Sequence, residues 1–159
     1  MKLKKYLYKS VTSTNDIAIK KIKQGLSKGF IVAKKQTKGR GRYGSKWIYM
    51  KDNLFLSIFF NIGIGINLKS ISLSSCKIVQ RSLANLINKK IKIKKPNDLL
   101  INNKKVCGIL SKANKIFGPF MVKNWLNNPV YSKFSEDRFF KIFVQRIDKK
   151  IEEIRNSVN

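Results

Sequence analysis

Apolar residues recur at helical spacing in three segments of the chain. The first follows the sequence VTSTND (11–16), whose polar residues predict a helix capped by Ser13 or Thr14. The second predicts a helix over about residues 71–88. The third begins at Ser135 and repeats its apolar residues at intervals of about four. This last helix is expected to bury Phe139, Phe140, Phe143, Ile147, Ile151 and Ile154.

Shorter apolar runs bounded by turn residues predict strands. FIVAKK (30–35) and NLFLSIFF (53–60) have the β-branched and aromatic composition that strands favour. IKIK (91–94) predicts a third strand. LLI (99–101) and VCGIL (106–110), with the turn NNKK after the first of them, predict a β-hairpin.

The predicted helices and strands follow one another without a linker or an internal repeat. The stretch 111–134 shows no clear period. The order helix, strand, glycine-rich loop, strand, helix, strand and hairpin predicts an α+β fold, with a mixed central β-sheet flanked by helices. At 159 residues the chain is expected to form a single domain, 1–159.

The charge of the chain is strongly positive. Lys and Arg total 35 against 8 Asp and Glu, which gives a net charge of +27. Most of the excess is lysine, and Lys, Ile and Asn are common throughout, as in proteins from AT-rich genomes. We therefore give the charge little weight as a functional signal, although a basic surface attracts polyanions and acidic proteins.

Several classes of protein are excluded by what the sequence lacks. Histidine is absent, which excludes Ser-His-Asp, Cys-His and His–metal sites. Cys76 and Cys107 are isolated, as expected for reduced thiols. No apolar run approaches the roughly 20 residues of a membrane span, and MKLKKYLYKS lacks the apolar core of a signal peptide. A cytoplasmic protein with no membrane partner is expected.

The glycine-rich stretch KQTKGRGRYGSKW (35–47) fits three kinds of segment. Gly39, Gly41 and Gly44 match the dinucleotide fingerprint, but a strand rather than a helix follows, and no acidic residue stands about 20 positions on. Arg-Gly-Arg at 40–42 could enter a DNA minor groove, although such arms are usually flexible tails. The third interpretation is a solvated loop between two strands.

Four motifs occur in the order and rough spacing typical of one enzyme family. They are STN (13–15), KQTKGRGRYGSKW (35–47), KKPNDLL (94–100) and NKKVCGIL (103–110). Together they resemble the catalytic core of biotin–protein ligases, over about residues 6–110. The resemblance implies a biotin/lipoate-protein-ligase-like catalytic domain.

The resemblance also implies a reaction, which is that of an ATP-dependent ligase. In this family biotin and ATP form biotinyl-5′-AMP, and a lysine of the biotin carboxyl carrier domain of acetyl-CoA carboxylase then accepts the biotin. The biotin carboxylate is already ionised at pH 7, so the first step needs no general base. It needs cations and amides that hold two anions together and stabilise the transition state. Mg²⁺ is expected with ATP, without a metal held directly by protein side chains.

Each site residue follows from its position in a motif. Arg42 and Lys105 are the implied catalytic residues. The implied biotin-binding residues are Ser13, Thr14, Asn15, Gln36, Arg40, Gly41, Arg42, Lys105 and Gly108. The implied ATP-binding residues are Arg40, Arg42, Trp47, Asn97, Asp98 and Lys105. Helix capping, core packing, an Asx turn or a solvated charge explains each of them more simply.

The match weakens after about residue 110. Lys95 stands where the family usually has Trp. The Gly-x-Gly-x-Asn strand that the family places after the hairpin is missing from 111–134, and GIGIN at 63–67 stands in the wrong chain order. We expect 111–159 to be divergent or truncated, with no N-terminal DNA-binding domain and no C-terminal β-domain.

Alternatives to an active biotin ligase stay open. The chain could be a catalytically impaired family member or a lipoate-type ligase, although Gly-Arg-Gly-Arg with Pro-Asn-Asp favours biotin. It could instead be a basic nucleic-acid-binding module, which the lack of a helix-turn-helix, an aromatic RNA-binding pattern or a zinc module disfavours. Because family members often pair through sheet edges, a homodimer is also compatible with the sequence.

Overall fold

The computed structural model of the chain describes residues 3–49, 53–60, 68–84, 86–87, 89–111, 116–122, 141–146 and 149. Two helices are labelled, α1 (Thr14–Lys23) and α2 (Leu68–Ala84), and residues 141–146 are also helical. The strands are β1 (Lys5–Val11), β2 (Lys28–Gln36), β3 (Gly39–Arg40), β4 (Lys46–Trp47), β5 (Leu54–Phe60), β6 (Lys92–Lys94), β7 (Asp98–Ile101), β8 (Lys104–Ile109) and β9 (Ile116–Val122). None of the described helices has the length and apolar character that a membrane crossing requires.

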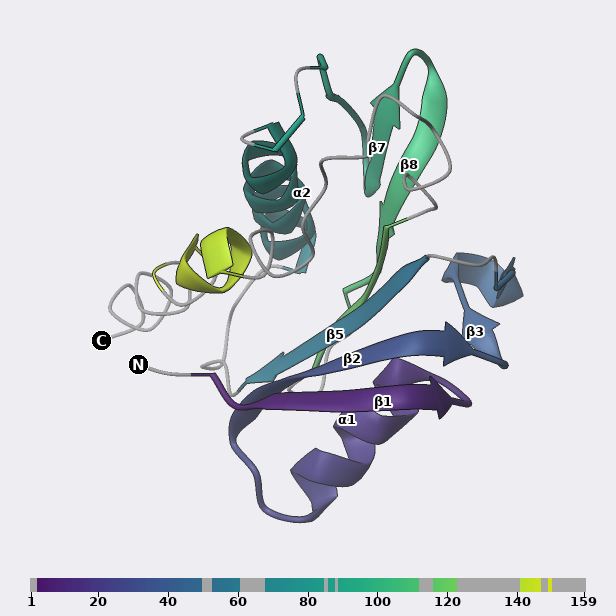
Figure 1. Cartoon of the computed structure of the whole chain (residues 1–159), viewed down its shortest axis with the longest axis vertical. Coiled ribbons are helices and arrows are strands. Elements are labelled where there is room, and N and C mark those ends of the chain that lie inside the picture. The colour runs from purple at the N-terminus through teal and green to yellow at the C-terminus, as the bar shows by residue number, and fades with distance from the viewer. Residues whose placement is uncertain are drawn as a thin grey trace.

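Seven strands form one twisted sheet in the order β1-β2-β5-β9-β8-β7-β6 (Figure 1). β1 and β2 are parallel, and the other pairs are antiparallel, so the sheet is mixed. β3 and β4 form a separate two-stranded hairpin at the end of β2. The predicted α+β fold with a mixed central sheet flanked by helices is confirmed.

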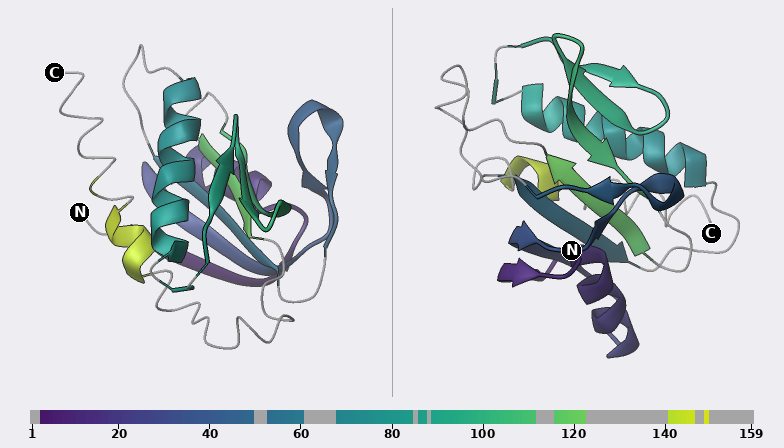
Figure 2. Two further views of the ribbon diagram at one scale, coloured as in Figure 1. Left: turned by 90° about the horizontal axis from the view of Figure 1, so that it is seen from above. Right: turned by 90° about the vertical axis from the view of Figure 1, so that its right-hand side faces the viewer.

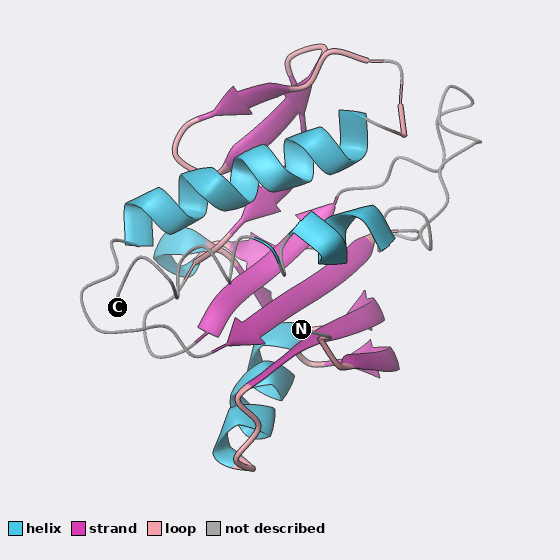
Figure 3. Ribbon diagram, turned by 90° about the vertical axis from the view of Figure 1, so that its left-hand side faces the viewer, coloured by secondary structure: helices cyan, strands magenta, loops and turns pink. Residues whose placement is uncertain are grey.

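The two helices lie on opposite faces of the sheet. Figure 3 shows α2 in front of the strands, and the right-hand view of Figure 2 shows α1 and the β3–β4 hairpin in front instead. All seven residues of β5 are buried because this strand is covered on both faces. Ile31 and Phe59 pack with Ala18 of α1, whereas Phe30 and Leu56 belong to the core beneath α2. The alternation of side chains along each strand thus divides the core into two layers.

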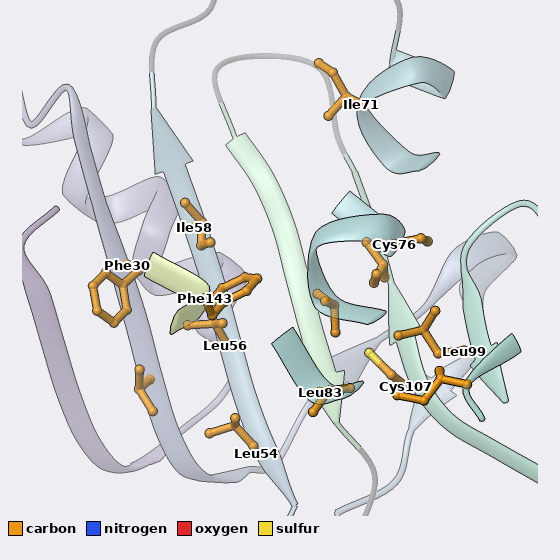
Figure 4. Packing of buried hydrophobic residues seen from close by; sticks show 14 of the residues in the cluster. Phe30, Leu54, Leu56, Ile58, Ile71, Cys76, Leu83, Leu99, Cys107 and Phe143 are labelled. Atoms are coloured by element: carbon orange, nitrogen blue, oxygen red, sulfur yellow. The ribbon is translucent and has the colours of Figure 1, made fainter. Parts of the chain in front are cut away.

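The larger core lies between the sheet and α2, and Figure 4 shows part of it. Phe143, from the helical residues 141–146, joins this core and is 1% exposed. Cys76 of α2 and Cys107 of β8 also lie there, both buried and both free thiols. Isolated, unbridged cysteines were expected from the sequence, and this expectation is confirmed.

Most predicted elements occur, with shifted boundaries. α1 begins at Thr14 with Ser13 as its cap, and β2, β5, β6 and the β7–β8 hairpin occupy the predicted segments. α2 begins at Leu68 and ends at Ala84, earlier at both ends than the predicted 71–88. Of the helix predicted from Ser135, only residues 141–146 and 149 lie within the described part of the chain. The GIGIN segment at 63–67 lies outside it.

Two strands of the sheet were not predicted. β9 lies within the stretch 111–134, in which no period was found, yet it pairs with both β5 and β8. Its sequence contains Gly118 and Pro119, which argue against a central strand. The pairing shifts register there, because Phe117 faces Ile58 whereas Phe120 faces Leu56. Two residues of β9 therefore face one of β5, and this bulge accommodates a residue that cannot donate a ladder hydrogen bond.

β1 escaped prediction for a different reason. It is an edge strand, and Val11 is its one buried residue. Leu7, its most apolar central residue, is 66% exposed. An edge strand that buries little has no apolar alternation for a sequence pattern to detect.

Candidate active site

A buried polar cluster lies where α1 begins, beside the end of β2. Oε1 of Gln36 accepts hydrogen bonds from the backbone N of Thr14 at 2.8 Å and from its Oγ1 at 3.2 Å. Oγ of Ser57, on β5, donates to Thr14 Oγ1 at 2.8 Å. Ser13 caps α1, and its Oγ accepts from the backbone N of Asn15 at 3.2 Å. The residues of the STN motif and Gln36, which are far apart in the sequence, are thus brought together.

Two buried polar atoms of this cluster have no hydrogen-bond partner among the described residues. They are Nε2 of Gln36, a donor, and Oδ1 of Asn15, an acceptor. Gln36 is 2% exposed and Asn15 is 5% exposed. An unpaired buried donor or acceptor costs about 1–3 kcal/mol. The cluster therefore offers one donor and one acceptor to a ligand that carries both a carbonyl oxygen and an N–H group.

The β3–β4 hairpin packs closely against this cluster at two glycines. A Cβ on Gly39 would overlap Nε2 of Gln36 and would lie 3.0 Å from the backbone O of Trp47. A Cβ on Gly41 would overlap Oγ of Ser45 and would lie 2.6 Å from Nε1 of Trp47. Both contacts require the absence of a side chain. Gly39 in particular lets the loop approach the unpaired amide of Gln36.

The tip of the hairpin is a tight turn and not the start of an α-helix. Residues Arg42–Gly44 form a single 3₁₀ turn, with positive φ at Tyr43 (53°) and Gly44 (76°). The backbone N of Gly41 donates to the carbonyl of Ser45 at 2.6 Å across the turn. This geometry agrees with the rejection of the dinucleotide fingerprint, which needs a helix at this point.

The two arginines of the loop differ in what is described. The guanidinium of Arg40 makes an ion pair with Asp16, in the first turn of α1. The side chain of Arg42, a predicted catalytic residue, lies outside the described part of the chain, and its role stays a prediction. Trp47, predicted to contact ATP, packs partly against Ala33 and Phe55, so core packing explains this residue as well.

The β7–β8 hairpin carries the remaining predicted residues. Nζ of Lys105 lies 2.7 Å from Oδ1 of Asp98, an ion pair between the two strands. A Cβ on Gly108 would lie 3.1 Å from Cε and 3.2 Å from Nζ of Lys105. Gly108 therefore leaves room for the lysine to lie along the sheet. Asn97 donates from Nδ2 to the carbonyl of Ile109 at 2.8 Å, so this predicted ATP contact also holds the strands in register.

Sheet register places the two groups on one face. Residues opposite each other form a row across the strands, which runs Tyr8, Ala33, Phe55, Met121, Gly108, Asp98 and Lys94. Such residues point to the same face of a sheet. Ala33 and Phe55 pack against Ile17 of α1, so Gly108 and Asp98 lie on the α1 face as well. Figure 2 shows the β3–β4 hairpin on this side of the sheet.

Both groups also lie at the same end of the sheet. β2 continues from Ala33 to Gln36, and β8 begins before Gly108, at Lys104, in the same direction along the sheet. Three strand spacings separate β2 from β8, which is about 14 Å at about 4.8 Å each. A small ligand lying across β5 and β9 could therefore contact the Gln36 cluster at one end and Lys105 at the other.

Sequence patterns missed two residues of this site. Ser57 is the one hydroxyl in the apolar run LFLSIFF, and that isolated polar position was a usable signal. Asp16 directly follows STN and looks like an ordinary acidic residue in a first helical turn. Its contact with Arg40 spans 24 positions and leaves no local signal.

Cysteine and metal chemistry find no support in the described residues. Burial raises the pKa of the Cys107 thiol well above its ordinary value, so the residue beside Gly108 stays protonated at neutral pH. No group of three His, Cys, Asp or Glu residues lies together in the described ranges. Mg²⁺ then belongs to the nucleotide substrate, as the counter-ion of its phosphates.

Most of the chain matches a known protein family. The sequence profile described as "Biotin/lipoate A/B protein ligase family" matches residues 7–122. The bifunctional ligase/repressor BirA of Escherichia coli is 33% identical over 105 residues, which cover 63% of this chain and 32% of BirA. BirA of Salmonella typhimurium matches to the same extent. The chain thus spans about a third of the length of these curated relatives.

The fold is similar to that of several solved proteins. The biotin acetyl coenzyme A carboxylase synthetase of Helicobacter pylori, with bound biotinylated ATP, has a TM-score of 0.81 at 23% identity, over 93% of this chain and 75% of that one. The biotin protein ligase of Aquifex aeolicus, in complex with biotin and ATP, has a TM-score of 0.79 at 23% identity, over 96% and 72%. These likenesses confirm the predicted ligase-like domain as a fold.

Proposed function

Because the chain belongs to the biotin/lipoate A/B protein ligase family, we propose that it is an ATP-dependent biotin–protein ligase. In the first step, a biotin carboxylate oxygen attacks the α-phosphorus of ATP, and pyrophosphate leaves. In the second, the uncharged amine of an acceptor lysine attacks the acyl carbon of biotinyl-5′-AMP, and AMP leaves. The proposed acceptor is the biotin carboxyl carrier domain of acetyl-CoA carboxylase.

The observation that carries the proposal is the unpaired donor and acceptor of the polar cluster. Biotin ends in a ureido ring, which presents one carbonyl oxygen and two N–H groups. Nε2 of Gln36 matches the carbonyl, and Oδ1 of Asn15 matches an N–H. Burying such a ring without partners would be costly, so these two atoms favour it over an apolar head. The dithiolane ring of lipoate has neither group, which favours biotin as the substrate.

Ser13 and Thr14 support the same pocket indirectly. Ser13 caps α1 and Thr14 fixes Oε1 of Gln36, which leaves Nε2 of Gln36 for the ligand. Their proposed biotin contact is therefore mainly through the position of Gln36 and Asn15. Preorganised partners of this kind cost the ligand little ordering on binding.

Cations hold the reacting anions in this proposal. Arg40 and Arg42, on the glycine-rich loop, approach the α-phosphate from one side, and Lys105 approaches the biotin carboxylate from the other. Two negatively charged groups must meet in the transition state, and fixed cations with the backbone N–H groups of the loop offset their repulsion. The common face and end of the sheet shared by the two hairpins support this arrangement.

The nucleotide and the acceptor are placed by chemistry. We assign Asn97, Asp98 and Trp47 to the nucleotide side, where Trp47 offers an aromatic edge and the β7 start offers polar groups. An acceptor lysine has an unperturbed pKa of about 10.4 and must lose its proton before it attacks. The net charge of +27 would steer an acidic carrier domain toward the protein.

Adenylate formation with a matched pair of lysine variants tests the proposal. We expect the chain to form biotinyl-5′-AMP from biotin and Mg·ATP, detected by mass spectrometry. Lys105→Ala should lower the rate at least about 100-fold, the size of effect that loss of one transition-state charge contact produces. Lys104→Ala, its exposed neighbour on β8, should retain the wild-type rate.

Equal rates for the two variants would remove Lys105 from the chemistry. If no adenylate forms and biotin does not raise the melting temperature, the chain is not a biotin ligase. Salt-sensitive DNA binding that is lost in Arg40→Ala would then favour the nucleic-acid alternative.

A further inference from the structure

The acidic residues of this chain are distributed unevenly with respect to function. The sequence holds 35 Lys and Arg and 8 Asp and Glu. The described ranges contain two of the acidic residues, Asp16 and Asp98. Asp16 pairs with Arg40 and Asp98 pairs with Lys105. In a chain crowded with lysine, each described carboxylate thus contacts a cation that the proposed function assigns to a substrate anion.

We propose that Asp16 and Asp98 are positioning residues that occupy the anion positions of the site until the substrate arrives. In the ligand-free protein, each carboxylate holds its cation at a fixed place. The ligand anions then replace the carboxylates. This inference rests on the proposed function for the identity of the anions, but the exchange itself requires only that the site bind an anion.

The geometry of the Arg40–Asp16 pair suits an exchange. The side chains are 62% and 37% exposed, so water and incoming anions reach both. Pairs this exposed contribute little stability, which makes them easy to replace. The first turn of α1 is also a favourable place for a carboxylate, because the helix dipole is positive there. Asp16 therefore remains stable after Arg40 has turned to a ligand.

The Lys105–Asp98 pair is more enclosed. The side chains are 39% and 21% exposed, and the Gly108 backbone beside them leaves room for the lysine stem. A partly buried cation without a counter-ion is costly, so Asp98 keeps Lys105 charged and ordered before the ligand binds. The two pairs lie at the two ends of the proposed ligand position, one for each of the reacting anions.

Such counter-ions also have a consequence for selectivity. A protein with a net charge of +27 attracts any polyanion, and free cations in its site would hold such molecules non-specifically. A carboxylate beside each cation repels anions that cannot engage the rest of the pocket. A cognate substrate offsets this loss with its other contacts.

Binding of inorganic pyrophosphate tests the proposal on the full chain without requiring catalysis. Titration calorimetry would compare the wild type with Asp16→Asn, Arg40→Gln and the double variant. Asp16→Asn should bind pyrophosphate about two- to five-fold more tightly, because its competitor for Arg40 is gone. In the Arg40→Gln background, the same change should have no such effect.

A charge-matched control separates the contact from the net charge. Gln24→Lys adds one positive charge at the exposed far end of α1, and it should change pyrophosphate affinity less than Asp16→Asn does. Equal effects of the two variants would overturn the proposal, because the overall charge would then suffice. Unchanged or weaker binding in Asp16→Asn would overturn it as well, and so would an effect that persists without Arg40.

A kinetic readout distinguishes positioning from mere stability. In adenylate formation, Asp16→Asn should lower kcat without raising the KM for ATP, because the cation is free but no longer oriented. Asp16→Glu should restore kcat. If the chain forms no adenylate at all, the proposed function fails, while the pyrophosphate cycle still decides between exchange and no exchange.

Discussion

At the scale of single residues, Gln36 is the side chain on which the site depends most. Its Oε1 accepts two hydrogen bonds from Thr14, and its Nε2 lies under Gly39 without a partner among the described residues. One amide thus joins α1 to β2 and leaves a donor for the ligand. A residue that is both structural and ligand-facing should show both effects when it is changed.

Gln36→Leu should lower stability and abolish biotin binding together. The variant leaves two donors of Thr14 unpaired, which costs about 1–3 kcal/mol in the free energy of unfolding. It also removes the donor for the ureido carbonyl, so biotin should no longer raise the melting temperature. Thermal unfolding with and without biotin measures both effects.

Gln80→Leu is the matched control for this prediction. Gln80 donates from Nε2 to the carbonyl of Ile91 at 2.6 Å, on the α2 side of the sheet and away from the site. This variant should lose stability but keep the biotin-dependent rise. If Gln36→Leu keeps that rise as well, Gln36 does not contact biotin.

The sequence predicted the residues of this site that stand in motifs, and it missed those that act across the fold. STN and the glycine-rich loop have compositions that are informative in themselves, since capping and close approach demand particular residue types. Asp16 and Ser57 are ordinary residues whose partners lie 24 and 43 positions away. Only the folded sheet brings these pairs together.

At the scale of elements, burial decided what could be predicted. β5 is buried along its whole length and α2 has a long apolar face, so both stood out as patterns. β1 buries little, and β9 contains a proline at a bulge, so neither matched a strand pattern. The central position of β9 depends on its two neighbours, β5 and β8, which no local pattern reveals.

The packing of α2 against β8 predicts a loss of stability at high pH. Burial, and then the charge of Asp98, raises the pKa of the Cys76 thiol from 9.0 to about 11. In the unfolded chain this thiol ionises near its ordinary pKa, whereas the folded chain keeps it protonated. Its contribution to stability is therefore complete below about pH 9 and is lost as the pH rises toward about 11.

Urea unfolding at a series of pH values measures this effect. The free energy of unfolding should fall less steeply between about pH 9 and 11 in Cys76→Ala than in the wild type. Alanine leaves a cavity, but that cost does not vary with pH. Parallel pH slopes for the two proteins would show that the Cys76 thiol titrates alike in both states.

At the scale of the whole molecule, the sheet is the frame that makes one site from two distant hairpins. The glycine-rich loop leaves β2 and the lysine hairpin enters β8, and the register across β5 and β9 puts them on one face and at one end. The family profile ends at residue 122, the last residue of β9. The matched region therefore contains every strand of this frame.

The central claim is that this frame activates biotin, and one competition measures it directly. The full chain is incubated with Mg·ATP and equal concentrations of biotin and lipoate, and the acyl-adenylates are quantified by mass spectrometry. The account predicts biotinyl-5′-AMP as the dominant product, because the amide of Gln36 and the carbonyl of Asn15 match a ureido ring. Formation of lipoyl-AMP alone, or of no adenylate, would contradict it.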